Sequence, residues 1–351
     1  MLRHRSHHAI ASAEGGFESP TLTEWRGRPW ATWSDPSGAY ARPLEPGGAP
    51  AGERRSLGPP CRGGLAVAGT ADALWAGCLR PGDGAQPGRA QLLRVDEAST
   101  APVDLGPAGR DSRGLDVAVH GERASVVWHD GTPGAWTIRQ ATVDLRRGKV
   151  RTRPLSEGRA AETPTLLRHA GRIAVAWVES WLGDEGTPRG RVILQRGNRR
   201  PEPVAKVHWA HPLPSLAADG RGPVLAFRDA RPGHARPGLY LQRLSTRLQP
   251  VGSPKRVGRA DGPGRARPIP CRDGWTTVAP ITWNRHRLVN LARVDAQFEP
   301  PEHEHRLYEW GTAFVQADAL CRADGLLLLL AERGDSVRPA ARLRAAHVAF
   351  E

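Results

Sequence analysis

The chain has 351 residues, a formal net charge of +14 and a hydrophobic share of 39%, with 40 Gly and 32 Pro. Its longest apolar run, Leu326 to Ala331, is far shorter than the ~18–20 residues of a membrane-spanning helix, so we expect no membrane span. Arg accounts for nearly all of the basic residues and is spread along the chain. No dense basic block is interleaved with aromatic residues, so we expect no specific nucleic-acid binding.

The first residues contain part of a secretion signal. The stretch MLRHRSHH supplies a basic start and Ala11–Ala13 resembles a cleavage site, but the apolar core of ~7–15 residues between them is missing. Either the protein is cytoplasmic or its true N-terminus lies upstream. An extracytoplasmic location is our hypothesis, and the bias toward Arg, Ala, Gly and Pro favours a bacterial source.

A motif of 18 residues occurs twice. The sequence ESPTLTEWRGRPWATWSD from Glu18 to Asp35 returns as ETPTLLRHAGRIAVAWVE from Glu162 to Glu179. The end of this motif, an apolar run that closes on an aromatic residue and an acid, recurs along the whole chain. In order, the copies are WATWSD (30–35), ALWAGC (73–78), SVVWHD (125–130), AVAWVE (174–179), VLAFRD (224–229), VAPITW (278–283) and LLLLAE (327–332).

The spacing of these copies, 45 to 56 residues, predicts the fold. In each unit a first strand leads through a Gly-containing turn to the motif strand, and a loop rich in Gly, Pro and Asp then leads to a third strand and a more polar fourth segment. Four antiparallel strands in ~40–50 residues are the signature of a β-propeller blade. We predict an all-β, seven-bladed propeller forming one domain over residues 1–351. The blades are placed at about 15–50, 51–103, 104–155, 156–205, 206–260, 261–308 and 309–351.

Two further details concern the closure and packing of this ring. Motif strands such as IAVAW are apolar on both faces, as expected for a sheet covered by a neighbouring blade on each side. The recurrent Trp would fill the space between blades. The last unit lacks a fourth strand, and residues 5–14 are predicted to supply it.

Four cysteines are present, at Cys61, Cys78, Cys271 and Cys321, and none has metal-site spacing such as CxxC. The first two could close a short loop, whereas the last two lie about one repeat apart at matching CR positions. Their disulfide state stays open, with four small buried side chains as the default expectation.

The rhythm of Gly, apolar strand, Trp and acid resembles that of sialidase-like propellers with BNR repeats, and the resemblance covers the whole chain. It concerns architecture alone, because the Asp-box S-x-D-x-G-x-x-W and the RIP motif of the family's arginine triad are absent. The only tyrosines are Tyr40, Tyr240 and Tyr308, and Tyr308 adjoins Glu309, so the two would point to opposite faces of a strand. No catalytic residue is therefore carried over, and a propeller need not be an enzyme.

The acid that closes the motif strand is the first set of candidate ligand-binding residues: Asp35, Asp130, Glu179, Asp229 and Glu332. The resemblance places the following loops on the face where propellers bind ligands. There these carboxylates could hold a cation, accept sugar hydroxyls or act as acid and base. In the alternative interpretation, which their repetition favours, each carboxylate accepts N–H bonds in its own turn.

The loop at 179–190, ESWLGDEGTPRG, is the best candidate for ligand contact, because binding residues concentrate on loops held by a rigid scaffold. It places Trp181 and Asp184 close to Glu179. An exposed Trp beside carboxylates suits stacking on a sugar or a peptide; a Trp buried between blades is the alternative.

A weaker candidate is HEHRLYEW (303–310), where His303 and His305 would share one strand face and could bind a metal. No third ligand is visible, so solvated loop histidines are the favoured interpretation. No cofactor is expected, and the sequence contains no nucleophile elbow, phosphate loop or dinucleotide fingerprint.

Together these observations favour a non-catalytic binding or scaffold module, monomeric, with a carbohydrate or protein ligand at the central mouth and loops of one face. One alternative is a glycoside hydrolase of the sialidase-like type, which would need an exclusive pair of carboxylates ~5–10 Å apart in the mouth. The other is a protein–protein interaction hub, which would present a large apolar patch on one rim.

Overall fold

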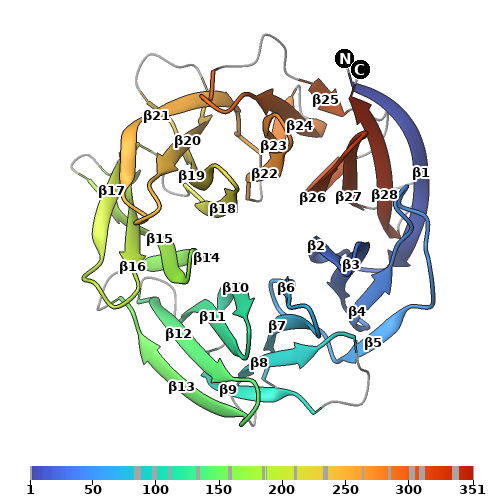
Figure 1. The fold of residues 1–351 in the computed structure, drawn as a ribbon, viewed down its shortest axis with the longest axis horizontal. Helices are drawn as coiled ribbons and strands as arrows, with labels where there is room; N and C mark the ends of the chain where they lie inside the picture. Colours follow the sequence, from blue (N-terminus) through green and yellow to red (C-terminus); the bar gives the residue numbers. More distant parts are fainter. Residues whose placement is uncertain are drawn as a thin grey trace.

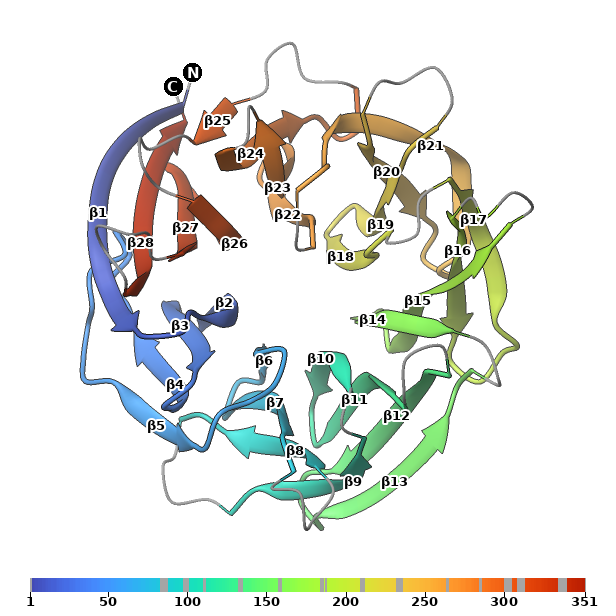
Figure 2. The same cartoon turned by 180° about the vertical axis from the view of Figure 1, so that it is seen from behind.

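The computed structural model describes residues 2–82, 88–96, 101–109, 112–131, 135–156, 160–183, 186, 188–208, 212–231, 236–262, 265–283, 286–299, 305–307, 313–333 and 340–350. Their strands form seven four-stranded sheets, arranged as blades around a central axis (Figures 1 and 2). The prediction of an all-β, seven-bladed propeller is confirmed. No helix within these ranges is long and apolar enough to cross a membrane.

Each of the first six blades is one continuous stretch of chain that runs from the innermost strand outward. Blade 1 contains β2 (Glu18–Trp25), β3 (Arg28–Asp35), β4 (Gly38–Pro43) and β5 (Arg55–Gly58), and blade 2 contains β6 (Leu65–Gly69), β7 (Leu74–Arg80), β8 (Gly88–Arg94) and β9 (Val103–Ala108). Blade 3 contains β10 (Arg113–His120), β11 (Arg123–Asp130), β12 (Thr137–Asp144) and β13 (Lys149–Pro154), and blade 4 contains β14 (Ala161–His169), β15 (Arg172–Leu182), β16 (Pro188–Arg196) and β17 (Glu202–Val207). Blade 5 contains β18 (Ser215–Asp219), β19 (Gly222–Asp229), β20 (Gly238–Leu244) and β21 (Pro250–Arg259), and blade 6 contains β22 (Arg267–Cys271), β23 (Gly274–Trp283), β24 (His286–Val294) and β25 (His305–Leu307).

Blade 7 is assembled from both ends of the chain. It contains β26 (Ala313–Arg322), β27 (Gly325–Arg333), β28 (Ala341–Phe350) and, as its outermost strand, β1 (Leu2–Ala13). Strand β1 pairs antiparallel with β28 from Leu2 opposite Phe350 to Ala13 opposite Ala341, and the two chain ends lie side by side (Figure 1). The N-terminal strand therefore closes the ring, as predicted.

The antiparallel order divides the connections between two faces of the ring. The turns between first and second strands and between third and fourth strands lie at one end of the blades, which we call the turn face; in blade 7 the ends of β1 and β28 replace the second of these turns. The second-to-third connections and the links between blades lie at the other end, which we call the loop face. Because all motif strands run in the same direction, their closing acids point toward the loop face.

The apolar core consists of seven clusters, each lying at one interface between two blades. The motif strands supply both sides: Leu326, Leu328 and Leu330 face blade 6, whereas Leu327 and Leu329 face blade 1. This alternation explains why such strands are apolar on both faces. The motif tryptophans Trp33, Trp128 and Trp177 are fully buried at these interfaces, as expected for residues that fill the space between blades.

The disulfide state that the sequence left open is given by the structure, in which the four cysteines form two disulfides rather than four separate buried side chains. Cys61 pairs with Cys78 and Cys271 with Cys321, each with a Cα–Cα distance of 5.4 Å. The first bond joins the link between blades 1 and 2 to β7, and the second joins the inner strands of blades 6 and 7. Spatial closeness at blade interfaces, which residue spacing alone does not reveal, brings each pair together.

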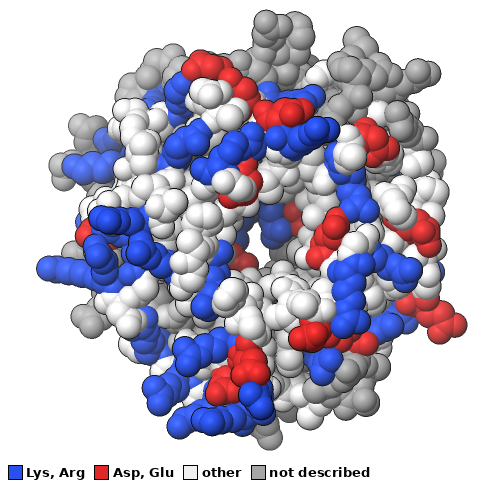
Figure 3. All heavy atoms as spheres, viewed as in Figure 1, with Lys and Arg blue, Asp and Glu red and all other residues white. Residues whose placement is uncertain are grey.

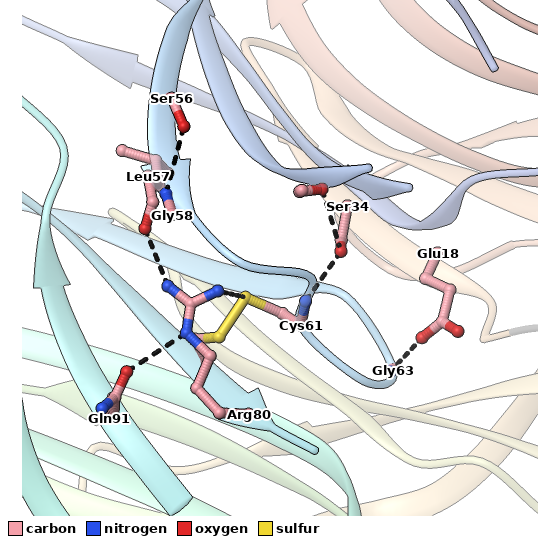
Figure 4. The surroundings of a disulfide bond; sticks show 11 residues. Glu18, Ser34, Ser56, Leu57, Gly58, Cys61, Gly63, Arg80 and Gln91 are labelled. Atoms are coloured by element: carbon pink, nitrogen blue, oxygen red, sulfur yellow. Dashed lines mark hydrogen bonds between the residues drawn. A yellow bond between two sulfur atoms is a disulfide. The ribbon is translucent and has the colours of Figure 1, made fainter. Parts of the chain in front are cut away.

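Around Cys61 the disulfide is part of a hydrogen-bonded junction between blades 1 and 2 (Figure 4). The Arg80 guanidinium donates to the Leu57 carbonyl at 2.7 Å and to Gln91 Oε1 at 3.1 Å, and it contacts Cys61 Sγ at 3.5 Å. Burial lowers the pKa of Arg80 to about 10. From blade 1, Ser34 Oγ accepts the Cys61 N–H at 2.8 Å. The junction fixes the first inter-blade link at the loop face.

Candidate functional site

The five closing acids are each tied to their own blade or to the link that precedes it. In blade 1, Asp35 Oδ1 accepts the backbone N–H of Ser37 at 2.8 Å and its hydroxyl at 2.5 Å. That hydroxyl also lies 2.9 Å from Tyr40 Oη, on the neighbouring strand. This is the turn-stabilising role of the alternative interpretation.

In blade 3, Asp130 is held by three partners. It accepts hydrogen bonds from the Gly109 N–H at 2.6 Å, the Ser112 hydroxyl at 2.7 Å and Arg139 Nε at 2.5 Å. Burial alone raises the pKa of Asp130, but these hydrogen bonds and the Arg139 charge outweigh it and hold the pKa below its ordinary value. Asp130 thus stays charged and joins the link from blade 2 to its own blade.

The remaining acids are paired with arginines. In blade 4, Glu179 Oε2 accepts from Arg191 Nε at 2.8 Å and Nη2 at 2.5 Å. In blade 5, Asp229 accepts the His208 N–H at 2.7 Å and Arg231 Nε at 2.9 Å. The set is completed by an ion pair in blade 7 between Glu332 and Arg344. All five carboxylates therefore have structural partners within the described chain.

Trp181 is exposed rather than buried between blades. It lies near the end of β15, which continues past the blade as a two-stranded arm in which Trp181 pairs with Arg189 and Leu182 with Pro188. The side chains of Trp181 and Leu182 are 48% and 73% exposed. The Arg191 guanidinium lies 5.9 Å from the Trp181 ring and also holds Glu179, so it links two of the predicted residues.

Three other predicted residues, Asp184, His303 and His305, give no support for a binding site. Asp184 and His303 lie outside the described residues. His305 is half-buried in the short strand β25. Within the described ranges, no three His, Cys, Asp or Glu side chains are close enough together to hold a metal ion.

The central channel contains polar residues that the sequence analysis did not select. In six blades, a polar residue occupies the same position of the innermost strand. It pairs with the motif-strand residue that precedes the motif aromatic, or with the equivalent residue in a blade without that aromatic. These polar residues are Thr21, Asp116, Thr165, Ser215, Arg267 and Asp318. They line a cavity of about 250 Å³ on the axis. Figure 3 shows the ring open at its centre, with basic and acidic atoms inside.

Asp318 and Asp116 accept the same backbone N–H bond at two different blade interfaces. Asp318 Oδ2, in blade 7, accepts the backbone N–H of Leu22 in blade 1 at 2.8 Å. Asp116 Oδ2, in blade 3, accepts the N–H of Leu166 in blade 4 at 2.8 Å and the Thr165 hydroxyl at 2.9 Å. The donors in each case belong to the Pro-Thr-Leu segment of the repeated motif. The two copies therefore resemble each other because each follows a blade with an inner-strand Asp.

Two arginines at the start of blade 6 lie near these aspartates. Arg267 Nη1 donates to Asp318 Oδ2 at 2.8 Å, and this carboxylate is the main reason that the pKa of Arg267 is raised. Arg265 crosses the channel and donates to the Pro164 carbonyl of blade 4 at 2.9 Å. Burial lowers the pKa of Arg265 to about 10, although the Asp116 charge opposes this shift.

The Arg265 contact holds an unusual piece of backbone. Its Nη2 also lies 3.3 Å from the Thr163 carbonyl, and Thr163 has a φ of 52°. A β-branched residue rarely adopts this left-handed conformation, which costs roughly 1–3 kcal/mol and persists only where neighbours enforce it. The channel thus combines two engaged carboxylates with arginine N–H groups, an arrangement that offers donors rather than a free acid and base.

Sequence reasoning missed Asp116, Asp318, Arg265 and Arg267. A signal was present for the aspartates, since each interrupts an inner strand and precedes a blade that opens with Pro-Thr-Leu. No such signal exists for Arg265, because its contact joins two blades that are separated by a third.

No protein-family model matches the sequence, and no curated protein is similar to it. Solved structures are similar in fold. The β-propeller domain of the Trilobed protease from Pyrococcus furiosus has a TM-score of 0.56 at 11% identity, over 95% of this chain and 94% of that chain. The polysaccharide lyase Uly1 has a TM-score of 0.55 at 8% identity, over 98% and 99%.

A subtype N10 neuraminidase-like protein of A/little yellow-shouldered bat/Guatemala is similar with a TM-score of 0.50 at 10% identity, over 99% of this chain and 100% of that chain. The architecture that this chain shares with the neuraminidase-like protein is a β-propeller. The motif rhythm indicated this architecture, and at such low identity the similarity extends to the fold alone.

Proposed function

We propose that the protein is a non-catalytic binding module that holds a carbohydrate on its loop face, with Trp181 as the principal contact. The exposure of Trp181 on a projecting β-arm is the observation that carries this proposal. An aromatic ring held in this way offers a flat apolar surface at low conformational cost. The neighbouring Arg191 N–H groups and the Glu179 carboxylate are of the kind that bond sugar hydroxyls.

The state of the acidic residues supports binding over hydrolysis. A glycoside hydrolase needs one carboxyl group free to donate a proton and a second free to act as base or nucleophile. The closing acids are engaged by arginines and turns, and both oxygens of Asp116 and Asp318 accept hydrogen bonds from the protein. Tyr240 is buried, and burial raises its pKa, which disfavours it as a nucleophile.

The two disulfides support an extracytoplasmic location, because such bonds persist in oxidising compartments. A carbohydrate ligand fits such a location. A protein ligand on the same arm is the other candidate, favoured by the exposed Leu182 beside Trp181.

The test is a glycan-array screen of the purified protein together with hydrolysis assays on the same sugars. We expect specific binding without turnover, and loss of binding in Trp181→Ala. The control is Val251→Ala, which removes an equally exposed apolar side chain from the outer strand of another blade. Turnover of any bound sugar would overturn the proposal in favour of a hydrolase. If Trp181→Ala still binds the sugar, the arm is not part of the binding site.

A further inference from the structure

A dense basic segment forms the outer edge of blade 3. Residues 146–153, RRGKVRTR, contain five basic residues in eight positions and no acid. They form the turn between β12 and β13 and most of β13, where Lys149, Arg151 and Arg153 are exposed. Alternate residues of a strand share one side and lie ~6.6–6.8 Å apart. This edge therefore presents evenly spaced positive charges.

The side to which these charges point follows from their neighbour in the strand. Thr152, between Arg151 and Arg153, turns its hydroxyl toward blade 2 and donates to the Leu105 carbonyl at 2.8 Å. Lys149, Arg151 and Arg153 consequently lie on the other side of the sheet, which faces blade 4.

Blade 4 adds further basic residues at the same end of the ring. Its first turn carries Arg172 and its third-to-fourth turn carries Arg199 and Arg200, all exposed. Because both kinds of turn lie at the turn face, these side chains join those of blade 3. We call the combined set the basic surface: Arg123, Arg147, Lys149, Arg151, Arg172, Arg199 and Arg200. In Figure 3 basic atoms gather over these two blades, at the left and lower left of the ring.

The basic surface is not neutralised by the protein. Nearby acids have other partners: Glu122 pairs with Arg146, Glu202 with Arg196, and Asp144 accepts the backbone N–H groups of the turn at 3.1 Å. Across the part of the chain that the structure describes, no side chain of the basic surface has a carboxylate partner. Its unpaired charges therefore create a local positive potential that attracts a polyanion.

We propose that the basic surface binds an acidic polysaccharide, and thereby anchors the propeller with its loop face directed outward. Six of its seven cations are arginines, whose planar guanidinium groups match carboxylate, sulfate and phosphate groups in a bidentate manner. A row of charges along a β-strand edge suits a linear polymer with repeated anionic groups. This ligand and its surface are separate from the sugar site proposed at Trp181, which lies at the opposite end of the blades.

Two observations favour a polysaccharide over other polyanions. The surface contains no aromatic residue, whereas proteins that bind single-stranded nucleic acids stack the bases on aromatic side chains. It also contains no exposed large apolar side chain of the kind that inserts into a lipid surface. The extracytoplasmic location proposed from the disulfides agrees with this choice, because nucleic acids are found mainly inside cells.

The test measures binding to heparin and to polygalacturonate, with single-stranded and duplex DNA and anionic phosphatidylglycerol vesicles as competing probes, at about 50 and about 200 mM salt. Two charge-reversal variants divide the surface: Arg147→Glu/Lys149→Glu/Arg151→Glu and Arg172→Glu/Arg199→Glu/Arg200→Glu. The control Arg28→Glu/Arg113→Glu/Arg342→Glu changes the net charge equally, at exposed residues on three blades that form no ion pair within the described part of the chain. Thermal unfolding verifies that each variant is folded. Where a Glu variant does not fold, the corresponding Gln variant is used instead.

We expect both surface variants to weaken polysaccharide binding at low salt by about tenfold or more, and the control by about twofold or less. The Trp181→Ala variant should bind these polymers like the wild type, which separates this proposal from the first. Equal losses in the control and surface variants would overturn the proposal, since attraction would then follow net charge. Tighter binding to DNA or to vesicles than to either polysaccharide would also overturn it and assign the surface to that class.

Discussion

Asp318, on the innermost strand of the last blade, accepts a hydrogen bond from the backbone N–H of Leu22 on the innermost strand of the first. The same carboxylate binds Arg267 of blade 6, so one side chain joins three consecutive blades at the axis. The ring is therefore closed twice, at its periphery by the pairing of β1 with β28 and at its centre by Asp318.

Asp318→Ala should destabilise the protein by about 2–4 kcal/mol, because it leaves the partly buried Arg267 charge and the Leu22 N–H without their partner. The free energy of unfolding in urea measures this effect. Asp116→Ala, which removes the equivalent contacts between blades 3 and 4, should also be destabilising. A free energy of unfolding equal to that of the wild type in Asp318→Ala would show that the inner contacts do not stabilise the closed ring.

Trp177→Ala and Trp181→Ala should differ sharply although they are four positions apart in the same strand. Trp177 is fully buried between blades 3 and 4, so its removal leaves a cavity and should cost about 3–5 kcal/mol. Trp181 is about half exposed, and its removal should change the stability by roughly 0.5 kcal/mol or less. Chemical denaturation of the two variants checks this difference. Similar losses in both would mean that the arm packs against the blade.

The two disulfides should contribute unequally to stability. The Cys271–Cys321 bond spans 50 residues and the Cys61–Cys78 bond 17 residues. Loop-closure entropy then predicts losses of about 4 and about 3 kcal/mol, respectively, when each pair is replaced by Ser. Thermal unfolding of the two double variants measures the order. Each double variant keeps one disulfide, so reductant should destabilise it further by breaking that bond. If reductant does not change the thermal unfolding of the wild type, the pairing is contradicted.

Asp130→Asn should lower stability in a pH-dependent manner. The folded-state pKa of Asp130 lies below its ordinary value, so its contribution is present above the unfolded-state pKa of ~3.9 and is lost as the pH falls through the folded-state value. We expect a deficit of about 1–2 kcal/mol near neutral pH that shrinks below about pH 4. Urea unfolding across this range tests the trend. Asp104→Asn, at an exposed ion pair, is the control and should change stability little. A stability deficit in Asp130→Asn that grows on acidification would contradict the lowered pKa of Asp130.

Much of the fold could be predicted from the sequence because a blade is a local unit. The spacing of the motif copies and the alternation of Leu326 to Leu330 are set within one blade, so they are visible in a short window of sequence. The closing strand was predictable for a related reason. Each repeat has four strands, so a last repeat with only three must take its fourth strand from elsewhere in the chain.

Contacts between blades were much less predictable. The disulfides, the inner-strand aspartates and the reach of Arg265 to blade 4 depend on which residues the closed ring brings together, and residue spacing does not contain that information. The exposure of Trp181 depends on how far the arm formed by β15 and β16 extends past blade 4. The basic surface combines a run that is visible in the sequence, residues 146–153, with Arg172, Arg199 and Arg200, which join it only because their turns share one face.

The composition of blade 7 has a consequence for how the chain is made. Synthesis proceeds from the N-terminus, so β1 leaves the ribosome before blades 1 to 6, whereas its partner β28 follows them. Until then, β1 has an unpaired edge that is open to other chains. The six continuous blades can assemble in the meantime, but the newborn protein must keep the twelve residues of β1 apart from wrong partners until β28 has been made.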